Sequence, residues 1–248
     1  IPASWPACSV ADVQNQLCAP GMPFEMEWVE IRGVPTRIWK NAHPNLAELA
    51  RAGRQHGDAT FLIYEEERVS FDGWFRAAAL LAAHLQAQGV GKGDRVALAM
   101  RNLPEWPVAF FAIAAIGAIC VPLNAWWTGP ELSYGLSNSG AKVLICDPER
   151  LDRAAPHFAE LPALEQVLVA RADGAVPGAT RLEDIIGSSA GWSALPDTDL
   201  PDVAIAADDP ATILYTSGTT GNPKGALGTH RNLTTNILSS GYAAARSV

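Results

Sequence analysis

The amino-acid sequence predicts an α/β fold in which helices cover a mostly parallel sheet. The main observation is that apolar runs of strand length alternate with helical patterns between residues 70 and 146. Hydrophobic residues make up 48% of the 248 residues and charged residues 18%, which is typical of a globular chain with a sizeable core. The longest apolar run, Val108–Val121, is interpreted as a buried helix and strand because it is short for a membrane span.

The residues before this alternation predict smaller elements. Residues 1–23 are rich in proline and alanine, lack a signal-peptide pattern and are expected to form an N-terminal arm ahead of one domain over residues 24–248. Glu27–Trp39 alternates around a Gly-Val-Pro turn and predicts a hairpin, and Leu46–Gln55 has a helical pattern. A second hairpin is expected around Glu65-Glu66-Glu67, which we interpret as a solvated turn and not as a metal site.

The alternating region begins with a helix that Ser70 caps and Gly89 ends. The elements after it are expected in the order strand Arg95–Met100, helix Glu105–Ala115, strand Ala118–Leu123, helix Pro130–Ser137 and strand Lys142–Cys146. The glycines of Gly89–Gly93 do not fit G-x-G-x-x-G and precede a strand, so they predict a helix-to-strand turn. Residues 171–209 predict a connecting region with one short helix, and Ala211–Tyr215 then predicts a buried strand.

Charge and cysteine content exclude several classes of partner. The net charge of −8 argues against nucleic acid, whose phosphates require a basic face. The cysteines form no CxxC pair and have no zinc spacing, so no metal site is expected; they are Cys8, Cys18, Cys120 and Cys146. Reduced thiols and a cytoplasmic location are therefore expected.

One segment has a composition suited to a polyphosphate. Its sequence is Tyr215-Thr216-Ser217-Gly218-Thr219-Thr220-Gly221-Asn222-Pro223-Lys224-Gly225. The glycines allow backbone N–H groups to approach phosphate oxygens, the hydroxyls donate hydrogen bonds without adding charge, and Lys224 supplies one cation. Pro223 stiffens the turn before that lysine.

The distribution of charge supports the same interpretation. No Asp or Glu follows Asp209, and Lys224, Arg231 and Arg246 make this end of the acidic chain locally basic. Composition alone leaves a mobile surface turn open as an alternative. A Walker A loop does not fit, because two residues separate the second glycine from the lysine.

The nine residues from Ser217 to Gly225 closely resemble the phosphate loop of the adenylate-forming superfamily, which comprises acyl-CoA synthetases, aryl-CoA ligases, peptide-synthetase adenylation domains and luciferases. The segments that resemble acyl-CoA synthetases in particular are Gly93–Ala97, Asn102–Trp106, Gly117–Asn124 and Gly140–Ile145. The resemblance runs from Trp28 to the end of the chain. It implies the helix-covered, mostly parallel sheets of the large N-terminal domain of an adenylate-forming enzyme, incomplete because the chain stops soon after the loop.

The resemblance also implies a two-step reaction. A carboxylate attacks the α-phosphate of Mg-ATP to give an acyl-adenylate and pyrophosphate, and the thiol of coenzyme A then displaces AMP. The implied phosphate-binding residues are Thr216, Ser217, Gly218, Thr219, Thr220, Gly221 and Lys224. His230 matches a histidine beside the acyl pocket, with a strand-end histidine without a ligand as its alternative. Ala125–Thr128 resembles fatty-acid-type members, or is a packed aromatic pair, so a fatty acid is the expected substrate.

The family pattern indicates what the chain lacks. In the family, the residues that bind Mg²⁺ and ribose and the lysine of the adenylation step come later in the sequence than this loop. This chain has no carboxylate after Asp209 that could bind the metal. The chain alone is therefore expected to have no appreciable ligase activity. Three alternatives stay open: a nucleotide-binding module without chemistry, an aryl-acid ligase or peptide-synthetase-like adenylation domain, and an interaction domain with an idle loop.

Overall fold

A seven-stranded sheet forms the centre of the molecule. The computed structural model describes residues 9–216 and 221–246. The strands of the sheet are β5 (Arg95–Ala99), β6 (Ile119–Pro122), β7 (Val143–Cys146), β8 (Gln166–Val169), β9 (Thr180–Arg181), β10 (Pro210–Thr216) and β11 (Lys224–Thr229). Their order is β11-β10-β6-β5-β7-β8-β9. In the described ranges β10 and β11 are antiparallel, and all the remaining pairs of neighbouring strands are parallel. The predicted α/β class is therefore confirmed.

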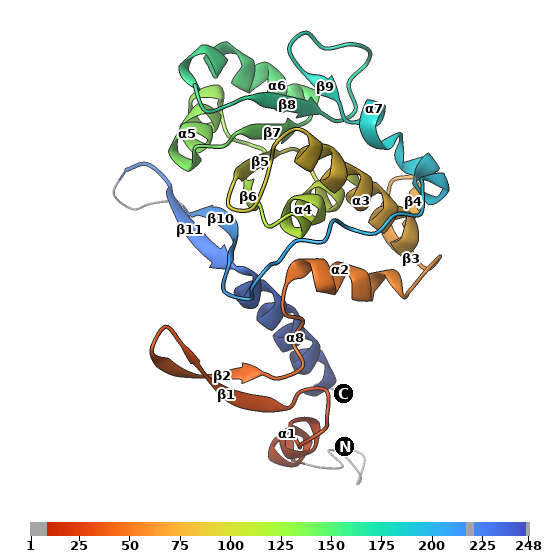
Figure 1. The fold of residues 1–248 in the computed structure, drawn as a ribbon, viewed down its shortest axis with the longest axis vertical. Helices are drawn as coiled ribbons and strands as arrows, with labels where there is room; N and C mark the ends of the chain where they lie inside the picture. Colours follow the sequence, from red (N-terminus) through yellow and green to blue (C-terminus); the bar gives the residue numbers. More distant parts are fainter. Residues whose placement is uncertain (1–8, 217–220, 247–248) are drawn as a thin grey trace, which may run out of the picture.

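Helices cover both faces of this sheet (Figure 1). The helices of the described ranges are α1 (Val10–Leu17), α2 (Leu46–Arg54), α3 (Phe71–Ala87), α4 (Glu105–Ala115), α5 (Gly129–Ser139), α6 (Pro148–Ala154), α7 (Glu183–Ile186) and α8 (His230–Arg246), with 3-10 turns η1 (Ala155–Glu160) and η2 (Ser189–Ala194). Of these, α1 lies away from the sheet, beside α8 and the first hairpin (Figure 1). Val96 and Leu98 of β5 pack with α3 and α4, whereas Ala97 and Ala99 pack with α5 and α6. Both faces of this strand are buried, as is usual in a parallel sheet.

The local signals around α3 act as the sequence predicts. The Ser70 hydroxyl accepts the Gly73 N–H at 3.1 Å, and Gly89 follows the helix with φ of +84°. The strands and helices expected between residues 95 and 146 are all found, with ends within two residues of those predicted. Within the described ranges, no helix is both long enough and apolar enough to cross a membrane.

Both predicted hairpins are confirmed. They are formed by β1 (Met26–Ile31) with β2 (Val34–Trp39) and by β3 (Thr60–Tyr64) with β4 (Glu67–Ser70). Arg32 and Gly33 connect β1 to β2 with φ of 52° and 77°, as a two-residue turn requires. This hairpin lies beside α8, away from the central sheet (Figure 1), and the Trp39 indole donates to Ser239 Oγ at 2.8 Å.

Several segments differ from expectation. The arm contains α1, which begins with a capping box between Ser9 and Asp12, although the boundary after residue 23 stays a prediction. The connecting region holds β9 and η2 in addition to its expected short helix, α7. No elements were predicted between residues 147 and 170, where α6 and β8 lie. These missed elements have two to eight residues, too few to show a clear period. Strand β11 and the 17-residue helix α8 were not predicted either.

Of the three carboxylates in the expected solvated turn, Glu65 and Glu66 are exposed, whereas Glu67 is partly buried and paired. This residue begins β4, and the Arg171 guanidinium donates to its two carboxylate oxygens at 2.8 and 2.9 Å. Arg171 also donates to Glu105 of α4, at 3.0 Å to each oxygen. Burial raises the pKa of the Glu105 carboxyl, although the arginine opposes this effect. The network therefore joins the second hairpin to α4 and to the chain that leaves β8.

Candidate functional site

The predicted phosphate loop leaves the sheet at the carboxyl end of β10. Because β10 runs parallel to β6, this end lies on the same edge as the carboxyl ends of the other parallel strands. Ligands of doubly wound sheets bind at that edge. Thr216 and Lys224 form the last pair of the β10–β11 ladder, so the loop spans the residues between them. Four of the predicted phosphate ligands lie outside the described residues: Ser217, Gly218, Thr219 and Thr220.

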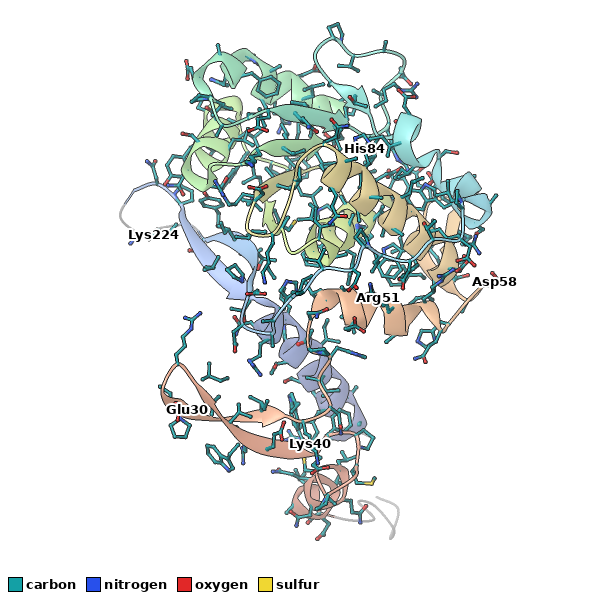
Figure 2. The ribbon with its side chains drawn as sticks, viewed as in Figure 1. Glu30, Lys40, Arg51, Asp58, His84 and Lys224 are labelled. Carbon is teal, nitrogen blue, oxygen red and sulfur yellow. The ribbon has the colours of Figure 1, made fainter. Side chains whose placement is uncertain are left out.

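The described members of the loop keep features that suit an anion. Gly221 has φ of 135°, a conformation that side chains rarely adopt. The Thr216 hydroxyl lies 3.5 Å from the Lys224 carbonyl oxygen and is exposed. Lys224 is exposed too, and no carboxylate in the described ranges pairs with its ammonium group. Figure 2 shows Lys224 near the outer end of the β10–β11 hairpin, away from α8.

Tyr215 fixes the first leg of the loop, by which we mean the end of β10 that leads into it. It pairs with Gly225 across the ladder, where a Cβ atom would lie 2.6 Å from a methyl carbon of Ile213 and 3.6 Å from the Tyr215 ring. The glycine therefore leaves room for the Ile213 methyl group, while the Tyr215 ring lies at ordinary contact distance from this position. The Tyr215 hydroxyl donates to Asn138 Oδ1 on α5 at 2.8 Å, and burial raises its pKa. The phenol is thus a neutral anchor between the sheet and α5.

Tyr134 fixes the second leg of the loop, which is the segment just before β11. This residue was not identified from the sequence. It lies on α5, and its hydroxyl donates to the Pro223 carbonyl oxygen at 3.0 Å. The rings of Tyr134 and Tyr215 meet edge to face, with centroids 6.3 Å apart. A sequence separation of 89 residues hides this contact from pattern reasoning. The one sequence feature that could have indicated this contact is the presence of an aromatic residue on the helix that follows β6.

His230 lies at the opposite end of the same hairpin. The six residues of β11 separate it from the loop by about 20 Å. Its side chain is fully buried, and its Nδ1 accepts the N–H of Leu46, the first residue of α2, at 3.2 Å. Burial lowers its pKa to about 4. A neutral imidazole with Nδ1 as acceptor places the proton on Nε2, which has no partner in the described structure. This geometry supports a helix-capping role, while the acyl-pocket role stays a prediction.

The basic character predicted for this end of the chain is concentrated at Lys224. Arg231 is paired with Asp208 at 2.7 Å, and Arg246 lies over the Tyr242 ring at 5.7 Å, so of these three cations Lys224 is the one beside the loop. Three clustered His, Cys, Asp or Glu residues that could hold a metal are not found in the described ranges. The residues described around the loop therefore do not fit a Mg²⁺ site.

A polar crevice lies further along the same edge of the sheet. Its volume is about 550 Å³, and it is lined by residues that directly follow β5, β7 and β8, among them Arg101, Asp147, Arg150 and Arg171. The Arg101 N–H donates to Asp147 at 3.0 Å, which joins the ends of β5 and β7. The chain continues from β5 to β6 on one side and returns to β7 on the other. The crevice is therefore at the topological switch point, where doubly wound sheets bind ligands.

A doubly wound sheet with a glycine- and threonine-rich loop at its carboxyl edge is typical of proteins that bind nucleotide phosphates. Residues 49–247 match the sequence profile of the AMP-binding enzymes, and the chain belongs to this family. The suspected membership of the adenylate-forming group, from the loop and the framework segments, is thereby confirmed.

Relatives and solved structures agree with this assignment. The chain is 35% identical over 188 residues to a feruloyl-CoA synthase of Amycolatopsis sp, covering 76% of this chain and 34% of that protein. It is 39% identical over 151 residues to a long-chain-fatty-acid–CoA ligase of Mycobacterium tuberculosis, covering 60% and 27%. An anthranilate CoA ligase in complex with anthranoyl-AMP superposes with a TM-score of 0.68 at 28% identity, covering 77% of this chain and 36% of that one. The chain thus spans about a third or less of the length of these curated relatives.

Proposed function

We propose that the full-length protein activates a carboxylic acid with ATP and transfers the acyl group to coenzyme A. A carboxylate oxygen attacks the α-phosphorus, the bond from that phosphorus to the pyrophosphate oxygen breaks, and an acyl-adenylate forms. The thiolate of coenzyme A then attacks the acyl carbon, and AMP leaves with the electrons of the broken bond. The main support is a family-specific loop at the ligand-binding edge of the sheet, whose Lys224 pairs with no carboxylate among the described residues.

The loop acts by position and charge. Negative charge develops on pyrophosphate as it leaves, and the proposed role of the Lys224 ammonium group is to offset it. Backbone N–H groups at Gly221 and its neighbours donate to phosphate oxygens, and the Thr216 hydroxyl adds a neutral donor. Mg²⁺ neutralises part of the ATP charge when bound, but the described residues offer it no ligand set, so we assign it no residue of this chain. The chain alone is proposed to be inactive.

We propose a fatty acid as the substrate, with aryl acids as the competing class. The fatty-acid–CoA ligase among the relatives and the Trp126-Trp127 pair support the first, and the feruloyl-CoA synthase supports the second. The described thiols Cys18, Cys120 and Cys146 are unpaired, which supports the proposed cytoplasmic location.

The polar crevice is the proposed site for the nucleotide part of coenzyme A. It shares its edge of the sheet with the loop, and Arg101 lies 4.3 Å from the centre of the exposed Trp126 ring. A guanidinium beside an exposed indole suits a phosphate next to a purine. Arg101→Gln is expected to raise the KM for coenzyme A about three- to tenfold while leaving adenylate formation unchanged.

Acid-dependent exchange of labelled pyrophosphate into ATP tests the proposed function. Exchange by the full-length protein should require a carboxylic acid, and a panel of fatty and aryl acids should identify the class. Thioester formation should then require a thiol, with coenzyme A preferred. ATP binding without any acid-dependent exchange would instead indicate a nucleotide-binding module without chemistry.

A further inference from the structure

Both legs of the phosphate loop are attached to one helix, α5. The first leg is attached through Tyr215, whose hydroxyl donates to Asn138 at 2.8 Å and lies 3.3 Å from the Gly135 carbonyl oxygen. The second leg is attached through Pro223, whose carbonyl oxygen accepts from Tyr134 at 3.0 Å. These contacts lie on either side of the loop and join it to a helix more than seventy residues upstream.

The contact at Pro223 lies where the sheet no longer constrains the chain. The β10–β11 ladder ends at the pair Thr216 and Lys224, so Pro223 is one residue beyond it. Proline has no N–H, so the backbone of Pro223 itself can be held by a hydrogen bond only through its carbonyl oxygen. That peptide plane leads directly into Lys224. A surface pocket of about 170 Å³ is lined by residues of α5, Tyr134 among them, and by Asn222 and Pro223, so the packing between the helix and this part of the loop is incomplete.

The helix itself is held firmly at three points. Thr128 and Glu131 form a capping box at its start, and Gly140 ends it in the left-handed conformation with φ of 61°. In its middle, a Cβ atom at Gly135 would lie 2.8 Å from a Leu123 methyl carbon, so the helix backbone is pressed against the chain that leaves β6. A helix fixed in this way can serve as a reference for the loop.

We propose that α5 is the platform that positions the phosphate loop, and that Tyr134 is a positioning residue that aims Lys224 through the Pro223 carbonyl. The proposal rests on the proposed role of the loop in adenylate formation. Tyr134 does not touch the nucleotide in this account. Its hydroxyl keeps the peptide before the lysine in place. Less conformational entropy is then lost when the ammonium group contacts the leaving pyrophosphate.

The test is a double-mutant cycle on the full-length protein, with Tyr134→Phe and Lys224→Ala singly and together. Tyr134→Phe removes one hydroxyl and keeps the ring, and it should slow acid-dependent pyrophosphate exchange at saturating ATP about fivefold to tenfold. In the Lys224→Ala background the same change should alter the rate less than about twofold, because the group that it positions is absent. Tyr242→Phe is the matched control, since that hydroxyl lies in the α8 aromatic cluster, and it should leave the rate unchanged.

The outcomes separate two kinds of failure. If Lys224→Ala leaves exchange unchanged, the proposed role of the loop is wrong, whatever Tyr134 does. If Lys224→Ala slows exchange but Tyr134→Phe behaves like Tyr242→Phe, the positioning role is wrong. Equal effects of Tyr134→Phe in both backgrounds, or a drop in melting temperature that accounts for the loss, would assign Tyr134 a structural role and also overturn the proposal.

Discussion

Replacing His230 by asparagine should remove an acid-sensitive contribution to stability. The folded imidazole accepts the Leu46 N–H through Nδ1, and burial lowers its pKa to about 4. In the unfolded chain the pKa is near its usual value of about 6.5. As pH falls, the unfolded state therefore takes up a proton first, and the stability present above pH 6.5 is lost between about pH 6.5 and pH 4.

The size of the effect follows from the two pKa values. Between pH 8 and pH 5, this histidine alone should reduce the free energy of unfolding by about 2 kcal/mol. Asparagine offers an amide oxygen to the Leu46 N–H but does not titrate. Its smaller volume should cost about 1 to 2 kcal/mol at pH 8. At pH 5 the wild-type protein and His230→Asn should therefore have nearly equal stability.

Urea unfolding followed by tryptophan fluorescence at pH 8 and pH 5 measures this difference. His230→Ala is the companion variant, because it leaves the Leu46 N–H without an acceptor and should cost about 1 to 3 kcal/mol more than asparagine at pH 8. A stability gap between wild type and His230→Asn that is the same at both pH values would refute the buried neutral imidazole. Equal losses for asparagine and alanine would refute the capping role.

Three further changes probe other parts of the account. Gly225→Ala places a Cβ atom 2.6 Å from a methyl carbon of the paired strand and should lower the free energy of unfolding by about 1 to 3 kcal/mol, measured by urea unfolding. Arg171→Met leaves Glu105 buried without its cation and should destabilise by about 2 to 4 kcal/mol, with partial recovery on adding Glu105→Gln; no recovery would contradict the pairing. Arg231→Gln should change ATP affinity less than about twofold, because the residue is paired away from the loop; a loss like that of Lys224→Ala in a titration would contradict this.

The sequence predicted the strands and helices between residues 70 and 146, whereas the 17-residue helix α8 was missed. Helix α3 has a serine cap, a glycine stop and an apolar face, and both its ends were located. The parallel strands were visible as apolar runs because both of their faces are buried. Helix α1 was missed although Ser9 and Asp12 form a readable capping box, since the surrounding composition favoured an arm. The neighbour order of the strands depends on contacts between distant segments, which no local pattern contains.

The candidate site was predicted in part. The loop sequence is contiguous, so its family-specific order was readable, and the strand that leads into it was expected over Ala211–Tyr215. The attachments of the loop were not readable, because Tyr134 and Asn138 reach it from a helix far upstream. The pairing of Arg231 with Asp208 was hidden for a similar reason, because 23 residues separate the two in the sequence. Composition counts charges, whereas pairing determines which of them are free.

Binding of ATP and AMP to the full-length protein and to Lys224→Ala tests the central claim most directly. If the loop binds the phosphates that leave as pyrophosphate, the substitution should weaken ATP at least about tenfold by titration calorimetry, because a charge-assisted contact is lost. AMP lacks those phosphates, and its affinity should stay the same. Equal affinities of both proteins for ATP, or equal weakening of ATP and AMP, would contradict the account.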